Sequence, residues 1–425
     1  MSKLLQFIFL IFFSQSIFCQ SLAPEITSWM VNITGVTGYN GFSANIQKVQ
    51  YSAGSVYVSC SGIPGYPIGL WPDGNPSTPL VQNYIFKIPR TQQVKSIPKR
   101  KTSLGQIGVL KNGVPIYNAL DARSYNNQGK WNQNAVVVEA KGFDAALGHP
   151  APGGKYHHHQ NPKSLYISDS TKHSSILGYS FDGYPIYGPY GYKNTDGTGG
   201  ITRITSSYKY RSITTRTTLP DGTVLSTSEY GPVVSTTYPL GYYMEDFEYS
   251  AGYGLLDEYN GRTAKTPEYP NGIYAYYVTI NSDGSSAYPF IIGPSYYGVI
   301  EVENLGAGRA TINEPTTEYW PTSNVDKKLI PTKIILHQNY PNPFNPKTVI
   351  RFGLPNESNV RITIFNSLGQ LVEEVVNERL NASFYEVNWI AQNHPTGLYF
   401  YKIEAVDIAK PNNKLTQTKK MMLVK

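Results

Sequence analysis

The chain contains very little cysteine, since only Cys19 and Cys60 occur among its 425 residues. Cys19 lies at the end of an N-terminal segment with the features of a signal peptide, and Cys60 alone cannot form an intrachain disulfide. An exported protein without disulfides has to be stabilised by core burial and, where one is bound, by a metal ion. The sequence therefore excludes a disulfide-rich scaffold.

Long apolar segments are also scarce, and the only clear one is N-terminal. Residues 1–3 include Lys3, residues 4–13 are apolar, and residues 14–20 are mostly small or polar. This order is typical of a secretory signal peptide, which we expect to span residues 1–19. Attachment as a lipoprotein through Cys19 is the second alternative, because bulky Phe18 stands where a small residue is preferred. No later segment is long and apolar enough to be expected to span a membrane.

Charged residues make up only 15% of the chain, with a formal net charge of +7. Lys and Arg are scattered, and the one tight run is Lys99-Arg100-Lys101. No nucleic-acid recognition motif accompanies this charge, so we predict no nucleic-acid partner. The positive charge better fits attraction to an anionic extracellular polysaccharide or a cell envelope.

Segments of helical periodicity are lacking, whereas Tyr (35), Gly (38) and Pro (30) are abundant and short β-branched runs recur. This composition favours an all-β fold of many short strands. We predict a large irregular β domain over residues 20–305. Asn-Gly and Asp-Gly pairs, including Asn112-Gly113 and Asp182-Gly183, predict turns between strands. The clearest predicted strands are residues 56–60, 84–88, 135–139 and 273–280.

The composition changes near residue 306. Residues 306–333 are polar and rich in Pro, Thr and Asn, which indicates a linker. Residues 334–425 regain strand alternation, so we predict a small Ig-like β-sandwich there. Its predicted strands are residues 349–354, 360–365, 385–389 and 397–403.

This last region carries several uncommon blocks in a fixed order: residues 339–346, 350–352, 364–372 and 395–401. Together they resemble the C-terminal sorting domain of the type IX secretion system of Bacteroidetes-type bacteria. The resemblance implies recognition by the outer-membrane translocon and sorting machinery, removal of the domain, and often attachment to surface lipopolysaccharide. We therefore expect a secreted protein, released or anchored at the outer-membrane surface.

The large domain resembles the YHYH family over residues 28–301. The family's name motif corresponds here to Tyr156-His157-His158-His159, in which His158 replaces the second tyrosine. The family is poorly characterised, so the resemblance implies no particular activity. Further matching blocks are residues 28–29, 35–39, 112–117, 148–150, 181–189, 255–262 and 288–290.

The motif offers candidate metal ligands. In an extended strand His157 and His159 point to one face while His158 points to the other. An Ala/Pro/Gly-rich bend can bring His149 back onto this pair, and imidazole ligands suit Zn or Cu. Alternatively, the histidines only cap turns or bond to backbone carbonyls. The predicted ligands are His149, His157, His159, Asp257 and Glu258, with Asp144 as another oxygen donor and Tyr156 as a ligand or an orienting group.

Asp257-Glu258, followed by Asn260-Gly261-Arg262, is the second candidate group. Paired acids beside an arginine can bind a cation or a sugar, or serve acid-base chemistry. An Asn-Gly hairpin with a local ion pair explains the pattern more simply. No Gly-x-Ser-x-Gly, His-Glu-x-x-His or phosphate-binding glycine loop is present in the sequence.

These observations predict a non-catalytic metal- or ligand-binding protein exported by the type IX system. The alternative function is that of a metal-dependent extracellular enzyme, either a polysaccharide or peptide hydrolase or a copper oxidoreductase. The many tyrosines also permit a carbohydrate-binding face, although most tyrosines are expected in the core.

Overall fold

The computed structural model describes residues 22–71, 75, 77–94, 97–321, 334–339, 341–412 and 414–425. The chain forms two compact units, Met1–Trp320 and Pro321–Lys425. The predicted signal peptide, residues 1–19, lies outside the described residues. Within the described part of the chain, no helix has the length and apolar character required to cross a membrane.

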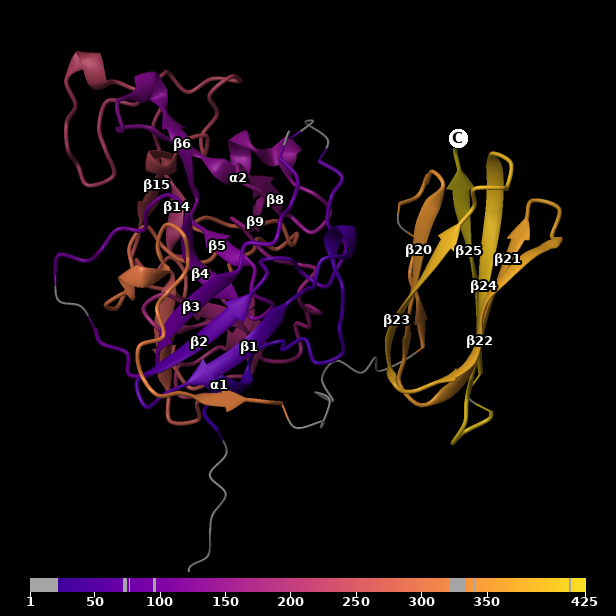
Figure 1. Cartoon of the computed structure of the whole chain (residues 1–425). Coiled ribbons are helices and arrows are strands. Elements are labelled where there is room, and N and C mark those ends of the chain that lie inside the picture. Colours follow the sequence, from indigo (N-terminus) through magenta and orange to yellow (C-terminus); the bar gives the residue numbers. More distant parts are fainter. Residues whose placement is uncertain are drawn as a thin grey trace, which may run out of the picture. The chain divides into compact units, whose positions relative to one another are not determined.

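A four-stranded antiparallel sheet forms one part of the first unit (Figure 1). It contains two of the predicted strands, residues 56–60 and 84–88, which are therefore confirmed. The strand order is β18 (Thr317–Tyr319), β1 (Ile46–Tyr51), β2 (Ser55–Cys60) and β3 (Tyr84–Pro89).

A six-stranded sheet forms the other large layer, and only β11 and β17 pair in parallel. The predicted turns at Gly113 and Gly183 connect β4 to β5 and β10 to β11, with left-handed φ values of 81° and 85°. The strand order is β16 (Gly261–Ala264), β17 (Ile273–Tyr277), β11 (Pro185–Tyr187), β10 (Ile176–Ser180), β4 (Gln106–Leu110) and β5 (Pro115–Tyr117).

The remaining elements of this unit are short ribbons, helices and 3-10 turns. The two-stranded ribbons are β6 (Leu120–Ser124) with β7 (Asn132–Asn134), β8 (His149–Ala151) with β9 (Lys155–His157), β12 (Tyr190–Tyr192) with β13 (Ile201–Arg203), and β14 (Tyr208–Tyr210) with β15 (Phe247–Tyr249). The helices are α1 (Pro24–Thr27) and α2 (Ala135–Val138), with 3-10 turns at Tyr39–Gly41, Tyr125–Asn127, Ala140–Gly142, Thr227–Glu229, Met244–Asp246 and Val302–Asn304.

The main core joins the two large sheets. Val58 and Phe86 from the first sheet lie in one cluster with Val109 and Tyr276 from the second, and all four are fully buried. Burial of apolar surface, at about 25 cal/mol per Å², is the main stabilising contribution here. A small separate cluster of Trp131, Leu225 and Tyr243 anchors the long loops between β14 and β15. Many tyrosines are core residues, as expected.

Two sequence-based predictions about local structure were wrong. Residues 135–139 were predicted as a strand, but Ala135–Val138 is the helix α2, because the Asn134 side chain accepts a hydrogen bond from the Val136 amide and so caps its first turn. Residues 306–320 were assigned to the linker, but they belong to the first unit. There Thr317–Tyr319 pairs with β1, and Gly308 accepts a hydrogen bond from Ile85.

The second unit is a β-sandwich, drawn in orange and yellow in Figure 1. Phe352 and Trp389 of one sheet share a buried core with Ile364 and Tyr401 of the other. All four predicted strands lie in observed strands. One sheet is β19 (Ile335–Leu336), β20 (Lys347–Leu354) and β23 (Ser383–Ile390), and the other is β22 (Leu371–Leu380), β21 (Ser358–Asn366), β24 (Gly397–Asp407) and β25 (Lys414–Leu423).

Candidate metal centre

The β8–β9 hairpin places His149 directly opposite His157 in antiparallel register. The connecting turn contains Gly153 and Gly154 with left-handed φ values of 80° and 73°. A Cβ on Gly154 would also approach the Leu80 side chain to 2.7 Å, so this turn needs glycine. The bend predicted from the Ala/Pro/Gly-rich sequence therefore exists and brings His149 back onto the motif.

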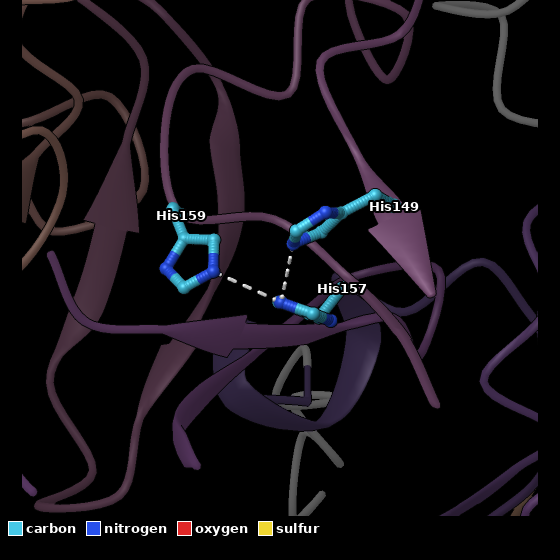
Figure 2. Close-up of side chains that lie close together, drawn as sticks. All are labelled: His149, His157 and His159. Atoms are coloured by element: carbon cyan, nitrogen blue, oxygen red, sulfur yellow. Dashed lines mark hydrogen bonds between the residues drawn. The ribbon is translucent and has the colours of Figure 1, made fainter. Parts of the chain in front are cut away.

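His159 continues from β9 along the edge of β5. The His158 amide donates to the Pro115 carbonyl (3.2 Å), and the Tyr117 amide donates to the His158 carbonyl (2.9 Å). This extended backbone places His157 and His159 on one face, and their rings converge with that of His149 (Figure 2). The Nε2 of His157 lies 3.1 Å from the Nε2 of His149 and 3.0 Å from that of His159.

His158 points away from this group, as the strand geometry predicts. Its Nδ1 donates to the Leu147 carbonyl (3.0 Å), and its Nε2 accepts a hydrogen bond from the Tyr66 hydroxyl (2.8 Å). Burial lowers the pKa of His158 to about 4. His158 is therefore a neutral structural residue that joins the motif to neighbouring loops.

Backbone carbonyls fix the tautomers of two of the converging rings. The Nδ1 of His157 lies 2.9 Å from the Lys155 carbonyl, and the Nδ1 of His159 lies 2.5 Å from the Asn118 carbonyl. A carbonyl can only accept, so each Nδ1 carries a proton and each Nε2 of a neutral ring presents a lone pair. Burial, followed by the two neighbouring histidines, holds the pKa of His157 well below its usual range.

Aromatic rings enclose the three histidines, whose residues are only 7%, 2% and 5% exposed at positions 149, 157 and 159. Tyr117 stacks on His157 with ring centres 3.8 Å apart and an interplanar angle of 23°. Phe143 packs against His149 at 4.8 Å. These contacts fix the ring orientations through close packing.

Glu139 is the acidic residue that lies beside the histidines. Its Oε2 is 3.2 Å from the Nε2 of His149 and 3.3 Å from the Nε2 of His159. Burial by itself would raise the pKa of Glu139, but hydrogen bonds and charge from His149 and His159, when these rings carry a proton on Nε2, outweigh burial and hold the pKa well below its usual range. Sequence analysis missed Glu139 because residues 135–139 were read as a strand, although Asn134 before an apolar run is a helix-capping signal.

The predicted oxygen ligands lie elsewhere. The described His, Cys, Asp and Glu residues whose ligand atoms all lie within 4.8 Å of one another here are His149, His157 and His159, without Glu139, Asp257 or Glu258. The Asp257 carboxylate accepts hydrogen bonds from the amides of Tyr259 and Gly261, so it closes its own Asn-Gly turn. Arg262 was expected to form a local ion pair with the acids of this turn. Its guanidinium instead donates hydrogen bonds to the carbonyls of Tyr192 and Lys193.

Asp144 and Tyr156 also serve the scaffold. The Tyr156 hydroxyl donates to Asp144 (2.9 Å), and three backbone amides, those of Gly69, Ala146 and Gly148, donate to the same carboxylate. These bonds occupy the lone pairs of Asp144 and hold the loop that precedes β8. These contacts hold the Asp144 and Tyr156 side chains in the scaffold and not at the three Nε2 atoms.

The whole group lies inside a segment that matches a known family. Residues 85–288 match the family model described as YHYH protein, and residues 338–422 match the model described as secretion system C-terminal sorting domain. The chain carries a YHYH domain and a sorting domain. The sorting domain indicates export through the type IX secretion machinery, to the medium or to the outer-membrane surface.

No curated protein is significantly similar to the chain. Among solved structures, dimeric latent PorU from Porphyromonas gingivalis is 21% identical with a TM-score of 0.18. The match covers 21% of this chain and 9% of PorU, so the chain spans only a small part of that protein's length. CopC from Methylosinus trichosporium OB3b is 17% identical over 21% of this chain and 92% of CopC, with a TM-score of 0.17.

PorZ, a type-IX secretion component of Porphyromonas gingivalis, is 11% identical over 93% of this chain and 47% of PorZ, with a TM-score of 0.15. At these TM-scores none of the three structures supports an argument about the fold or function of the YHYH domain.

Proposed function

We propose that this exported protein binds one transition-metal ion, zinc or copper, in its YHYH domain. The ligands are the Nε2 atoms of His149, His157 and His159, and the role of the ion is binding or structural. The observation that carries the proposal is the convergence of three buried Nε2 atoms, with separations of 3.0 and 3.1 Å from the central one.

A cation accounts for this convergence better than hydrogen bonds alone. The Nδ1 atoms of His157 and His159 are protonated, so their Nε2 lone pairs face each other at 3.0 Å when the rings are neutral. The single in-plane lone pair of His157 cannot accept good hydrogen bonds from both neighbours. Facing lone pairs repel each other. One cation between the three nitrogens removes this repulsion and binds all three Nε2 lone pairs.

The distances also suit metal coordination. Nitrogen ligands at about 2.0–2.1 Å from a tetrahedral zinc ion are about 3.3–3.4 Å apart, and in a square plane they are about 2.8–3.0 Å apart. The observed separations of 3.0 and 3.1 Å lie between these values. Imidazole ligands favour zinc and copper over magnesium and calcium.

The surroundings support a binding or structural role. Metal-bound histidines usually donate their second N–H to a fixed acceptor, and the carbonyls of Lys155 and Asn118 provide this for two of the three rings. Three protein ligands leave the fourth position of a tetrahedral ion to a water or to a further protein donor, so a structural role requires a fourth donor beside the histidines. The alternative role, a metal-dependent hydrolase or copper oxidoreductase, is favoured only by the Glu139 side chain, which is 30% exposed and opens one side of the group toward solvent.

For the sorting domain we propose recognition by the type IX translocon and sorting machinery, followed by release or attachment to surface lipopolysaccharide. This proposal rests on the family match of residues 338–422. Mass analysis of the secreted protein tests it, because attachment adds a glycolipid to a chain that has lost the sorting domain.

Elemental analysis of the purified full chain tests the metal proposal. The protein is stripped with a chelator, reconstituted separately with zinc and copper, and freed of excess ion. We expect about one tightly bound ion per chain in the parent and near-complete loss in a His157→Gln/His159→Gln variant that retains its near-ultraviolet circular dichroism. A His337→Gln/His394→Gln variant is the matched control, because it removes two histidines from the sorting unit. Absence of bound ion from the folded parent, or equal binding in all three proteins, contradicts the proposal.

A further inference from the structure

Glu139 is held at the metal group by its own short helix. Asn134 caps α2, and the Glu139 amide donates to the Ala135 carbonyl (2.9 Å), so the backbone at Glu139 is fixed just after the helix. The carboxylate reaches the histidines, and its Oε2 lies 3.2 and 3.3 Å from the Nε2 atoms of His149 and His159.

The position of Glu139 Oε2 is unusual for a carboxylate oxygen. The atom is buried, yet no donor among the described residues makes a hydrogen bond of acceptable geometry to it. A buried carboxylate oxygen without a donor is costly unless a cation compensates it. Its two nearest neighbours are the same Nε2 atoms that present lone pairs to the metal position.

We infer that Glu139 Oε2 is the fourth metal ligand and completes a three-histidine, one-glutamate set. This inference rests on the proposed metal-binding function. It assigns the site a closed coordination shell and a divalent ion, because the single carboxylate charge partly compensates an ion held by three neutral imidazoles. The site thereby binds its ion without offering a coordination position to a substrate.

The four donor atoms form a ring with nearly equal edges. Going around from Glu139 to His149, His157, His159 and back, the edges measure 3.2, 3.1, 3.0 and 3.3 Å. The set of ligand atoms that all lie within 4.8 Å of one another contains the three histidines without Glu139. Two ligands at about 2.0–2.1 Å from one ion are at most about 4.2 Å apart, so Glu139 Oε2 has to shift toward His157 when the ion binds. The other nearby carboxylate, Asp144, is occupied by three amides and the Tyr156 hydroxyl.

Titration of the full chain with Co²⁺, and competition with Zn²⁺, tests this assignment. Four-coordinate Co²⁺ absorbs visible light much more strongly than Co²⁺ with five or six ligands, so the spectrum reports whether the shell is closed. We compare the parent with Glu139→Gln and Glu139→Ala. Asp121→Asn is the matched control, because Asp121 interacts electrostatically with Glu139, lies outside the ligand group, and loses the same charge.

We expect the parent and Asp121→Asn to bind within about twofold of each other and to give the intense four-coordinate spectrum. Glu139→Ala should bind at least about tenfold more weakly, since even loss of an outer-shell partner typically costs 10- to 100-fold in affinity. Its spectrum should be weaker, because loss of the glutamate lets more than one water bind and raises the coordination number to five or six. Glu139→Gln should lie between the two.

Two negative results are distinguishable. If Glu139→Ala and the parent have the same affinity and the same spectrum, Glu139 is not a ligand, while the three-histidine site stands. If the folded parent binds neither Co²⁺ nor Zn²⁺, the proposed metal-binding function itself fails.

Discussion

Replacement of Arg216 by methionine should destabilise the first unit strongly and disturb the metal group indirectly. Arg216 and Asp246 form a two-pronged ion pair, with Nε to Oδ1 at 2.7 Å and Nη2 to Oδ2 at 2.8 Å, and both side chains are fully buried. Arg216 also donates to the carbonyls of Pro232, Tyr238 and Pro239. The variant therefore leaves a buried carboxylate and three carbonyls without this donor.

Removal of one partner of such a buried pair typically costs about 3–5 kcal/mol of unfolding free energy, because the remaining charge is uncompensated. That loss is a large share of a total stability of about 5–15 kcal/mol. With a urea m-value of about 3 kcal/mol per M, the unfolding midpoint should fall by about 1–1.7 M.

The effect should reach the metal group through one loop. The Asp246 carboxylate accepts hydrogen bonds from the amides of Gly241 and Tyr243. The same loop is bonded to Asn134, whose side chain donates to the Gly241 carbonyl and whose amide donates to the Tyr242 carbonyl. Asn134 in turn caps the helix that ends at Glu139. We therefore expect weaker metal binding in Arg216→Met than in the parent.

Urea unfolding followed by tryptophan fluorescence is the assay, because Trp131 is 1% exposed and packs beside Tyr243 in the same cluster. An Arg216→Met/Asp246→Leu double variant should be less destabilised than the sum of the single variants, since it leaves no unpaired charge. A loss below about 1 kcal/mol for Arg216→Met, the level of an exposed pair, would refute this reasoning.

Three further predictions follow from single side chains. Tyr117→Phe should keep the zinc affinity of the parent, whereas Tyr117→Ala should weaken it, because the ring stacks on His157 at 3.8 Å. Competition with a coloured chelator measures both affinities, and equal zinc affinities of Tyr117→Ala and the parent contradict the stacking role. Burial raises the pKa of Glu245 to about 7, so its stabilising contribution is complete below its ordinary value near 4.5 and is lost as pH rises through 7. Thermal unfolding measures this at pH 5 and pH 8. The free energy of unfolding of Glu245→Gln, relative to that of the parent, should rise by up to about 3 kcal/mol between the two pH values. A difference that is the same at both pH values contradicts this. Cys60 should react with a thiol reagent only after unfolding, because it is 2% exposed and burial raises its pKa; fast reaction of the native protein contradicts this.

Much of the fold follows from local sequence patterns. Alternation of apolar and polar residues, together with β-branched residues, predicted β2, β3 and four strands of the sandwich. These strands bury every second side chain or lie wholly in a core. The short run 135–139 was misread because its valines favour a strand, whereas the cap at Asn134 and the contact of the Ala135 amide with the Ala119 carbonyl select a helical turn.

The histidine part of the site was predictable and the carboxylate part was not. Local rules are sufficient for His149, His157 and His159, because a tight hairpin and strand periodicity bring them together. Glu139 arrives from α2, outside the hairpin, and a contact between separate elements has no local signature. Asp257 looked equally suitable in the sequence, but its carboxylate is used by the amides of its own turn.

The most direct test of the metal site is an anomalous difference map of a crystal of the zinc-loaded full chain, recorded at the zinc absorption edge. We predict one strong peak at about 2.0–2.1 Å from the Nε2 atoms of His149, His157 and His159. A well-ordered domain in which the three rings enclose no anomalous peak, or in which zinc lies only at other residues, would contradict the account.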